Sequence, residues 1–354
     1  MTDRLSRRQI LKLGAAAPVA IALSAMQVPT AVAATPPATP NMMPLPGPPT
    51  MSLPGPNMMP SRKKGVGVAR LVSDAPYRVE AMNPAWYYTW AADGIPGVQN
   101  VEFVPMVWGG VNNIQTQISE VEALSPGRQR VVLGPNEPDN AAQSNMTVAE
   151  VLQYWAQITD LAALTVAPAP VHPLDAWIME FMQQATKMNL RPNFIAVHTY
   201  PGADPEGFLS GIDQVYTTYG LPIWVTEFAV ADWNASKTVA NSYTAQDVLG
   251  FMEAVLPGLE SRPYVARYAW FGAGPAAAAS PALGPSALFD TSGAITALGE
   301  YYAQFGVAPV PAPPGPSPVP APLGPPPVPA PPGPSPVPAP LGPPPVPAPP
   351  AMSS

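Results

Sequence analysis

The sequence predicts an α/β protein whose central part folds as a (β/α)8 barrel, with proline-rich segments on both sides. Between residues 62 and 307 the chain contains eight short apolar runs separated by amphipathic or loop stretches. Strands that alternate with helices imply a parallel sheet, because each strand must return to the same end of the sheet. The 246 residues of this part are close to the ~250 of such barrels.

The eight runs are rich in β-branched and aromatic residues, as strands are. An open doubly wound sheet is the alternative, and it favours a glycine-rich turn after the first strand. Gly65-Val66-Gly67 lies inside that strand instead, which favours the barrel. The predicted strands are 65–69, 85–90, 102–108, 130–134, 164–167, 194–200, 222–227 and 265–271, and the predicted helices include 148–163, 174–188, 205–219 and 244–256.

Residues 1–33 have the pattern of a twin-arginine signal peptide. Ser6-Arg7-Arg8 precedes an apolar, alanine-rich run, and Ala31-Val32-Ala33 forms a small-residue cleavage site. A membrane anchor is the alternative, but the run is shorter than the ~20 apolar residues of a spanning helix and contains Pro18. We therefore expect export by the twin-arginine route to the cell exterior or cell wall, with no stable membrane span after cleavage.

Charge and cysteine content restrict the function classes. Four of the 16 Lys and Arg and one of the 23 Asp and Glu lie in residues 1–33, so the remainder carries a formal charge of −10. Nucleic-acid binding requires clustered positive charge, so we expect no nucleic-acid partner. With no cysteine and two histidines, a zinc site is not expected, and neither is any cofactor.

Two proline-rich segments flank the central part. Residues 34–61 are rich in proline and methionine and are predicted to be a linker. Residues 308–354 form a tail that repeats every nine residues up to about Pro350, beginning with Val310-Pro311-Ala312-Pro313-Pro314-Gly315-Pro316-Ser317-Pro318. Such a tail is predicted to be an extended polyproline II rod. It is either a passive spacer or a ligand for a cell-wall polymer or an aromatic groove.

Two motifs place a glutamate at the end of a predicted strand: Gly134-Pro135-Asn136-Glu137-Pro138-Asp139 and Trp224-Val225-Thr226-Glu227-Phe228. The active sites of (β/α)8 barrels form at the carboxyl ends of the strands. Glu137 follows the fourth strand and Glu227 ends the seventh. Two carboxylates at this edge are what glycoside hydrolysis requires, one for proton transfer and one for attack or for activating water.

With these positions, the chain resembles the retaining glycoside hydrolases of clan A and, more closely, glycoside hydrolase family 128, β-1,3-glucanases with a compact barrel. Two departures, Thr89 in the aromatic cluster and Pro135 before the Asn-Glu pair, affect the expected sugar sites rather than the carboxylates. The matching residues are Trp86-Tyr87-Tyr88-Thr89-Trp90, Leu133-Gly134-Pro135-Asn136-Glu137-Pro138-Asp139, His198-Thr199-Tyr200, Trp224-Val225-Thr226-Glu227-Phe228 and Tyr268-Ala269-Trp270-Phe271.

The resemblance implies that Glu137 is the general acid/base and Glu227 the nucleophile. A retaining pair has its carboxyl groups about 5–5.5 Å apart, whereas an inverting pair has them roughly 6.5–9.5 Å apart. Structural glutamates in a salt bridge or a buried network are the alternative for both residues.

Further side chains are candidates for substrate binding. Asn136 is expected to donate to a sugar hydroxyl, unless it is a turn asparagine. His198 and Tyr200 share one face of the sixth strand and are expected at the site, with a satisfied interior histidine as the alternative. Aromatic side chains near strand ends are expected to stack on sugar rings, although barrel cores also contain tryptophan. These aromatic candidates are Tyr88, Trp90, Trp108 and Trp270.

The sequence thus predicts a secreted retaining endo-glycosidase that cleaves a β-glucan, with β-1,3-glucan as the expected polymer. Mannan, xylan or an envelope glycan would require the same two glutamates. A catalytically silent glycan-binding wall protein is the alternative from another functional class.

Overall fold

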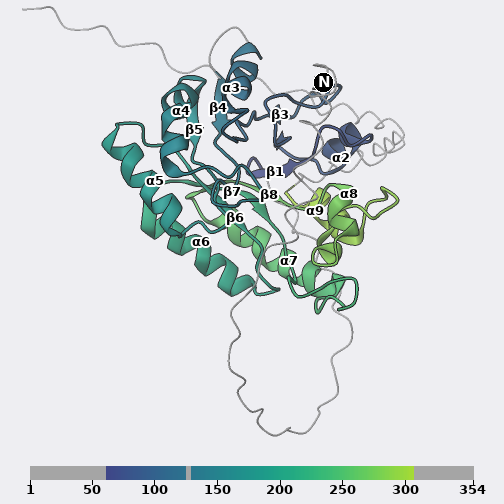
Figure 1. The fold of residues 1–354 in the computed structure, drawn as a ribbon. Coiled ribbons are helices and arrows are strands. Elements are labelled where there is room, and N and C mark those ends of the chain that lie inside the picture. Colours follow the sequence, from purple (N-terminus) through teal and green to yellow (C-terminus); the bar gives the residue numbers. More distant parts are fainter. Residues whose placement is uncertain (1–60, 125–128, 307–354) are drawn as a thin grey trace, which may run out of the picture. The chain divides into compact units, whose positions relative to one another are not determined.

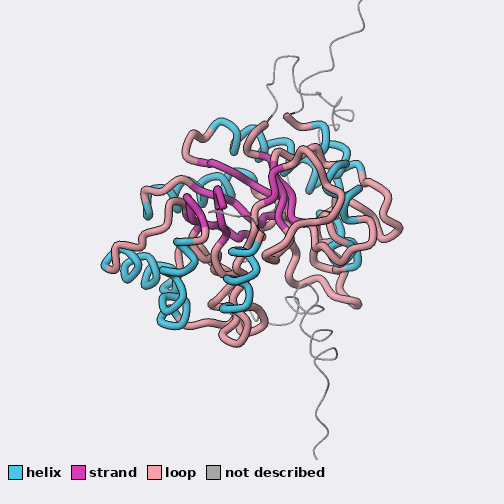
Figure 2. Tube along the Cα trace, turned by 90° about the horizontal axis from the view of Figure 1, so that it is seen from above, coloured by secondary structure: helices cyan, strands magenta, loops and turns pink. Residues whose placement is uncertain are grey.

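The structure is a computed structural model, and it describes residues 61–124 and 129–306. The predicted signal peptide, almost all of the predicted linker and the predicted repeat tail lie outside these residues. The described chain is an α/β fold in which strands lie centrally and helices surround them (Figure 1, Figure 2). No described helix is long and apolar enough to span a membrane.

All strand pairs are parallel. Six strands form one sheet in the order β3-β2-β1-β8-β7-β6, and β4 and β5 form a second sheet. Single parallel bridges link the two sheets, Met106 with Leu133 and Val166 with Phe194. The strands are β1 (Lys64–Gly67), β2 (Trp86–Tyr88), β3 (Glu102–Phe103), β4 (Gln129–Leu133), β5 (Ala162–Val166), β6 (Ile195–Thr199), β7 (Ile223–Phe228) and β8 (Val265–Trp270).

Each predicted strand is therefore present, although most are shorter than predicted. The largest difference is β3, where pairing ends at Phe103 because Pro105 has no N–H to donate to a ladder. The chain beyond it still runs beside β4, since the amide of Val107 donates to the carbonyl of Leu133 at 3.0 Å. The C-terminal end of β4 consequently lies beside the segment that follows β3.

The four named helices are also present, with local signals at their ends. Thr147 and Thr244 begin α4 and α7 with capping boxes, and Gly220 ends α6 in a left-handed conformation. α7 continues past Pro257, beyond the predicted end. The helices are α2 (Ala75–Ala81), α3 (Ile114–Ala123), α4 (Val148–Asp160), α5 (Ala176–Lys187), α6 (Pro205–Tyr219), α7 (Ala245–Ser261), α8 (Pro275–Ala279), the 3₁₀ turn η1 (Gly284–Ser286) and α9 (Ala297–Gln304).

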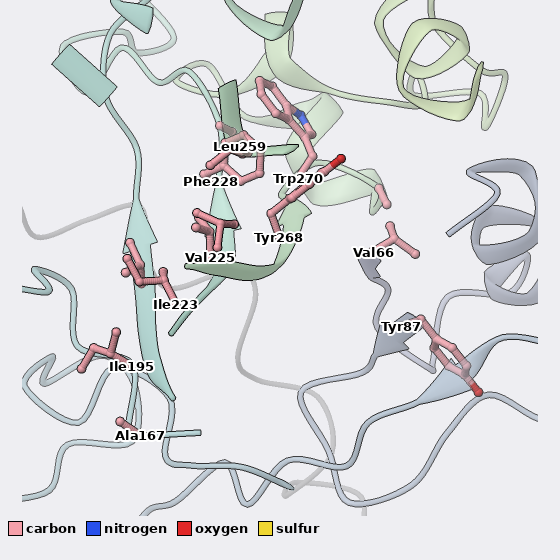
Figure 3. Close-up of a cluster of buried hydrophobic side chains, with 14 of the residues drawn as sticks. Val66, Tyr87, Ala167, Ile195, Ile223, Val225, Phe228, Leu259, Tyr268 and Trp270 are labelled. Atoms are coloured by element: carbon pink, nitrogen blue, oxygen red, sulfur yellow. The ribbon is translucent and has the colours of Figure 1, made fainter. Parts of the chain in front are cut away.

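Two hydrophobic clusters lie on opposite faces of the strands. One packs the strands against the helices and includes Val66, Val225 and Trp270 (Figure 3). The other consists of strand and strand-flanking side chains, among them Trp86 and Trp224, whose ring centroids are 5.1 Å apart. Because side chains alternate along a strand, this division decides which residues can reach the site.

The glycines of β1 serve close packing. A Cβ on Gly65 would lie 2.1 Å from the ring of Trp86, and one on Gly67 would lie 2.6 Å from the ring of Trp90. The two glycines of β1 therefore leave room for two indole rings. They lie within the strand and do not form the glycine-rich phosphate-binding turn that a doubly wound sheet would have after its first strand.

Candidate active site

Both predicted catalytic glutamates lie at the carboxyl ends of the strands. Glu227 is on β7, and Glu137 follows β4 by four residues. His198 on β6 lies between them. One ligand atom from each of these three buried side chains lies within 4.8 Å of the other two, so an oxygen of Glu137 faces an oxygen of Glu227 across that distance.

The backbone after β4 holds Glu137 by pairing with both neighbouring segments. The amide of Asn136 donates to the carbonyl of Trp108 at 2.9 Å, and the amide of Glu137 donates to the carbonyl of Ala169 at 2.7 Å. Glu137 has φ +38°, a strained conformation for a residue with a side chain, and such residues persist where surrounding contacts enforce them. Asn140 then fixes the side chain by donating to Oε2 at 2.9 Å.

Glu227 receives a donor on each oxygen. The indole N–H of Trp90 donates to Oε1 at 2.7 Å, and the hydroxyl of Tyr200 donates to Oε2 at 2.5 Å. Trp90 lies just after the end of β2 and has a positive φ of +56°. This conformation turns the residue out of the direction of the strand. Hydrogen bonds of this kind stabilise an ionised carboxylate.

The imidazole of His198 contacts both glutamates. Its Nδ1 lies 3.2 Å from Oε1 of Glu137, and its Nε2 lies 3.6 Å from Oε1 of Glu227. The side chain is buried, and Nε2 has no hydrogen-bond partner among the described residues. A ring that faces a carboxylate on each side is suited to the doubly protonated, charged form.

Charges and burial shift the pKa values of all three groups. Burial raises the pKa of Glu227, helped by the charge of Glu137 and opposed by His198. Burial also acts to raise the pKa of Glu137, but the hydrogen bond and charge of His198 outweigh it, so this pKa is lowered. Burial acts to lower the pKa of His198, yet the two carboxylates reverse the effect and raise it. These shifts favour the charged forms of His198 and Glu137, which face each other, and disfavour the charged form of Glu227.

Aromatic rings line the Glu227 side of the site. Phe271 packs edge-on against Trp90 and Tyr200, with centroids 6.0 and 5.5 Å apart. Tyr200 in turn contacts Trp233, which is 36% exposed. Trp90 and Phe271 also line a small open pocket whose other walls are glycines and alanines from the end of β1, the β8–α8 connection and α8. Apolar ring faces beside a carboxylate suit the C–H faces of a sugar.

Two of the predicted aromatic contacts are wrong. Trp270 is 0% exposed, its indole donates to the carbonyl of Ser286 at 2.8 Å, and it packs among core residues on the helix side of β8 (Figure 3). Tyr88 is 1% exposed, and its hydroxyl donates to the carbonyl of Thr226 at 2.9 Å. Neither ring can reach a sugar, because the alternation of β8 and the packing of the strand interior enclose them.

Asn136 and Trp108 lie near the site without touching the carboxylates. The amide nitrogen of Asn136 donates to Gln143 at 3.3 Å. The amide oxygen of Asn136 and the indole N–H of Trp108 are buried without a partner among the described residues. Their sugar contacts stay predictions.

Sequence reasoning did not single out Phe271, Trp233 or Asn140. Phe271 neighbours the residue that was chosen, and strand alternation was the signal that could have found it. Asn140 follows Pro138-Asp139 in a turn-forming stretch, where a side chain can reach back to Glu137.

Glu137, His198 and Glu227 are also the one described group whose geometry could hold a metal ion. Each of the four carboxylate oxygens already faces a hydrogen-bonding group. Trp90 and Tyr200 donate to Glu227, whereas Asn140 and the imidazole of His198 face Glu137. Because hydrogen-bond donors stabilise carboxylates in the absence of a cation, this arrangement suits a carboxylate pair better than a metal site.

Comparison with known proteins agrees with this geometry. Residues 70–302 match the family model of the glycosyl hydrolase catalytic core. Alkali-sensitive linkage protein 1 of Schizosaccharomyces pombe is 30% identical over 225 residues, which are 61% of this chain. The matched region spans 39% of the length of that relative.

Solved structures give the same result. A family 128 subgroup I endo-β-1,3-glucanase from Amycolatopsis mediterranei, a glutamate variant in complex with laminarihexaose, has a TM-score of 0.59 and 30% identity, and the match covers 69% of this chain and 99% of that one. A subgroup VII oligosaccharide-binding protein from Trichoderma gamsii has a TM-score of 0.55 and 21% identity over 70% of this chain and 94% of that one, which indicates a shared fold. The chain therefore belongs to the glycosyl hydrolase catalytic core family and, within it, to glycoside hydrolase family 128.

Proposed function

We propose that this protein is a retaining glycoside hydrolase that cleaves β-1,3-glucan, with Glu137 as general acid/base and Glu227 as nucleophile. One observation carries the proposal: two buried carboxylates face each other with oxygens within 4.8 Å. This separation suits direct attack on the anomeric carbon. Oxygens this close are typical of the ~5–5.5 Å carboxyl separation of a retaining pair rather than of the ~6.5–9.5 Å that lets an inverting pair accommodate a water.

The fold supports the same assignment. The bridges that link β3 to β4 and β5 to β6 complete a ring of eight parallel strands, which we interpret as a (β/α)8 barrel. In such a barrel the carboxyl ends of all strands surround one site. Glu137 after β4 and Glu227 on β7 would then face each other across its opening.

In the first step, Glu227 attacks the anomeric carbon while Glu137 protonates the leaving oxygen. Trp90 and Tyr200 orient Glu227 and stabilise it in its ionised form, and each of its oxygens keeps a further lone pair for attack. The product is a glycosyl-enzyme ester on Glu227 and a released sugar with a free hydroxyl.

In the second step, Glu137 acts as a base. It takes a proton from a water that attacks the same carbon, and the bond to Glu227 breaks to regenerate the carboxylate. The donors on Glu227 assist here, because negative charge returns to the carboxylate as it leaves.

The polymer is proposed from the relatives. The Amycolatopsis enzyme is an endo-β-1,3-glucanase solved with laminarihexaose. The aromatic rings of Phe271 and Trp233, which pack against Tyr200, would stack on successive sugars of such a chain. We extend the proposal to a secreted protein, on the basis of the twin-arginine pattern in residues 1–33.

A glycan-binding protein without activity is the second candidate, since the Trichoderma protein of the same fold binds oligosaccharides. The donor set around both carboxylates argues for catalysis. A binding surface has no need for two buried glutamates held within 4.8 Å of each other at the cost of like-charge repulsion.

The test is reducing-end release from β-1,3-, β-1,4- and mixed-linkage glucans, mannan and xylan. The protein lacking residues 1–33 is compared with Glu137→Gln and Glu227→Gln. We expect turnover on β-1,3-glucan that both substitutions abolish. Azide should partly rescue Glu137→Gln on an activated aryl glycoside, because a small anion can replace the base-activated water.

Two outcomes would overturn the proposal. Activity that persists in both variants would exclude the carboxylate pair. Binding of laminari-oligosaccharides by the intact protein and by both variants, with no product from any of them, would establish the binding protein instead.

A further inference from the structure

The acid step requires a proton on Glu137, but the resting geometry keeps that residue ionised. Both of its oxygens face donors, Asn140 on Oε2 and the imidazole of His198 on Oε1. A carboxylate that accepts two hydrogen bonds beside a positive charge is held in its charged form. The proton for the leaving group must therefore come from elsewhere in the site.

His198 is the nearest store of that proton. Its Nδ1 lies 3.2 Å from Oε1 of Glu137, within hydrogen-bond reach. Its Nε2 lies 3.6 Å from Oε1 of Glu227 and has no hydrogen-bond partner among the described residues. The ring is buried, so it exchanges protons with these two carboxylates more readily than with bulk solvent.

We propose that His198 holds the acid proton of the resting site and passes it from Nδ1 to Oε1 of Glu137 when the substrate enters. The inference rests on the proposed function, since it specifies how the acid of that reaction is charged. His198 acts through Glu137 and does not itself touch the sugar, so it is a positioning residue for the proton.

The proton balance closes over one turnover. The N–H bond at Nδ1 breaks and an O–H bond forms on Glu137, which leaves a neutral imidazole that keeps its Nε2 proton toward Glu227. Glu137 then gives its proton to the leaving oxygen as Glu227 attacks. In the second step Glu137 takes a proton from water and returns it to Nδ1, which restores the starting state.

Substrate entry supplies the reason for transfer. Before transfer the pair is a cation and an anion, and afterwards it is two neutral groups. Excluding water from the site favours the neutral pair, because separate charges lose hydration. The charge on Glu227, the nucleophile, is unchanged by the transfer.

The surrounding titratable groups favour an imidazolium at rest. Glu137 and Asp139 after β4 and Glu227 on β7 all act to raise the pKa of His198 against its burial. Tyr200, whose pKa burial raises well above its usual value, stays a neutral donor. His172 in the segment after β5 acts on Glu137, where its charge lowers the pKa.

The first test uses pH profiles of His198→Gln with two leaving groups on a laminari-oligosaccharide. An imidazole ordinarily holds its proton about two pH units higher than a carboxyl group. With a sugar leaving group, we expect the alkaline limb of kcat/KM to move down by about one unit or more, with a loss near neutrality of about 100-fold, as for a missing general acid. With 2,4-dinitrophenolate, which leaves without a proton, kcat/KM should stay near that of the parent.

A structural role for His198 would lower kcat/KM equally for both leaving groups and leave the alkaline limb in place, and this result would overturn the proposal. It would not affect the proposed function, which fails only if the parent protein releases no sugar.

The second test needs no turnover. The chain has two histidines, so histidine-selective 15N labelling gives two imidazole signals, and His172→Gln assigns them. We expect His198 to titrate above the ordinary histidine pKa and to shift downward in Glu137→Gln, which removes the facing negative charge. A His198 ring that is neutral below the ordinary histidine pKa would refute the proposal.

Discussion

Replacing Tyr200 with phenylalanine tests the assignment of Glu227 as the ionised nucleophile. The change removes one hydroxyl, which donates to Oε2 at 2.5 Å, and retains the ring that packs on Phe271. Burial already raises the pKa of Glu227. Losing a donor to the charged form raises it further.

The magnitude follows from the hydrogen bond. Bonds to charged groups contribute about 1.5–3 kcal/mol, and one pKa unit corresponds to about 1.36 kcal/mol. The pKa of Glu227 should therefore rise by about one to two units. A group whose pKa rises is protonated at higher pH, so activity is lost earlier as the pH falls.

The assay is the pH dependence of kcat/KM on a laminari-oligosaccharide, because its acid limb reports the free enzyme's nucleophile. Tyr219→Phe is the matched control. It removes a hydroxyl that donates to the carbonyl of Pro173 at 2.8 Å rather than to either glutamate, and it should leave the limb unchanged. An acid limb that does not move in Tyr200→Phe would refute the assignment of Glu227.

Three further substitutions separate stability from binding. Trp270→Ala should lower the free energy of unfolding in urea by about 3–5 kcal/mol, as for other buried aromatic residues, and should leave the affinity of the folded protein for laminarihexaose unchanged. Phe271→Ala should instead raise KM, with a smaller loss of stability, because its half-buried ring packs at the edge of the core against Trp90 and Tyr200, the two donors to Glu227. Lys64→Met should lower the free energy of unfolding by about 1–3 kcal/mol in the same measurement. The Lys64 ammonium donates to the carbonyls of Tyr302, Ala303 and Phe305 at 2.7, 3.1 and 2.7 Å, and the substitution leaves these carbonyls without their donor. An unchanged midpoint of unfolding would show that they find other donors.

The sequence predicted the strands and the two glutamates because both leave local signals. A short apolar run that ends in a charged residue between prolines, as around Glu137, has few structural explanations. The order of such runs along the chain then places Glu137 and Glu227 at the same carboxyl-terminal edge of the parallel strands. The structure agrees at both positions.

The choice between Trp270 and Phe271 could not be made from residue type. Both residues are aromatic and adjacent at the end of β8. Residue type favours Trp270 for stacking on a sugar, because tryptophan has the larger ring face. The register decides: Tyr268 and Trp270 face the helices, whereas Ala269 belongs to the opposite cluster with Trp86. A shift in register between β7 and β8 near the strand ends makes such assignments uncertain before the pairing is known.

The donors around the carboxylates were also outside the reach of sequence reasoning, since they come from distant segments. Trp90 lies 137 residues from Glu227, and His198 lies 61 residues from Glu137. No periodicity links such pairs. They meet because parallel strands bring their carboxyl ends to one edge.

This long-range origin explains how two like charges can stand so close. Glu137 and Glu227 repel each other, and Glu137 and Trp90 both adopt strained positive φ values that isolated loops would relax. The opposing contributions are backbone bonds from the chain after β3 and β5 and side-chain donors from the ends of β2 and β6. Because four separate segments hold the two glutamates in place, the loss of one carboxylate charge should leave the backbone of the site largely unchanged. Neutralising Glu227, whose pKa is raised by burial and by the charge of Glu137, removes this repulsion and should therefore raise the midpoint of thermal unfolding while it abolishes turnover, the expected signature of a site whose geometry is maintained for catalysis at the expense of stability.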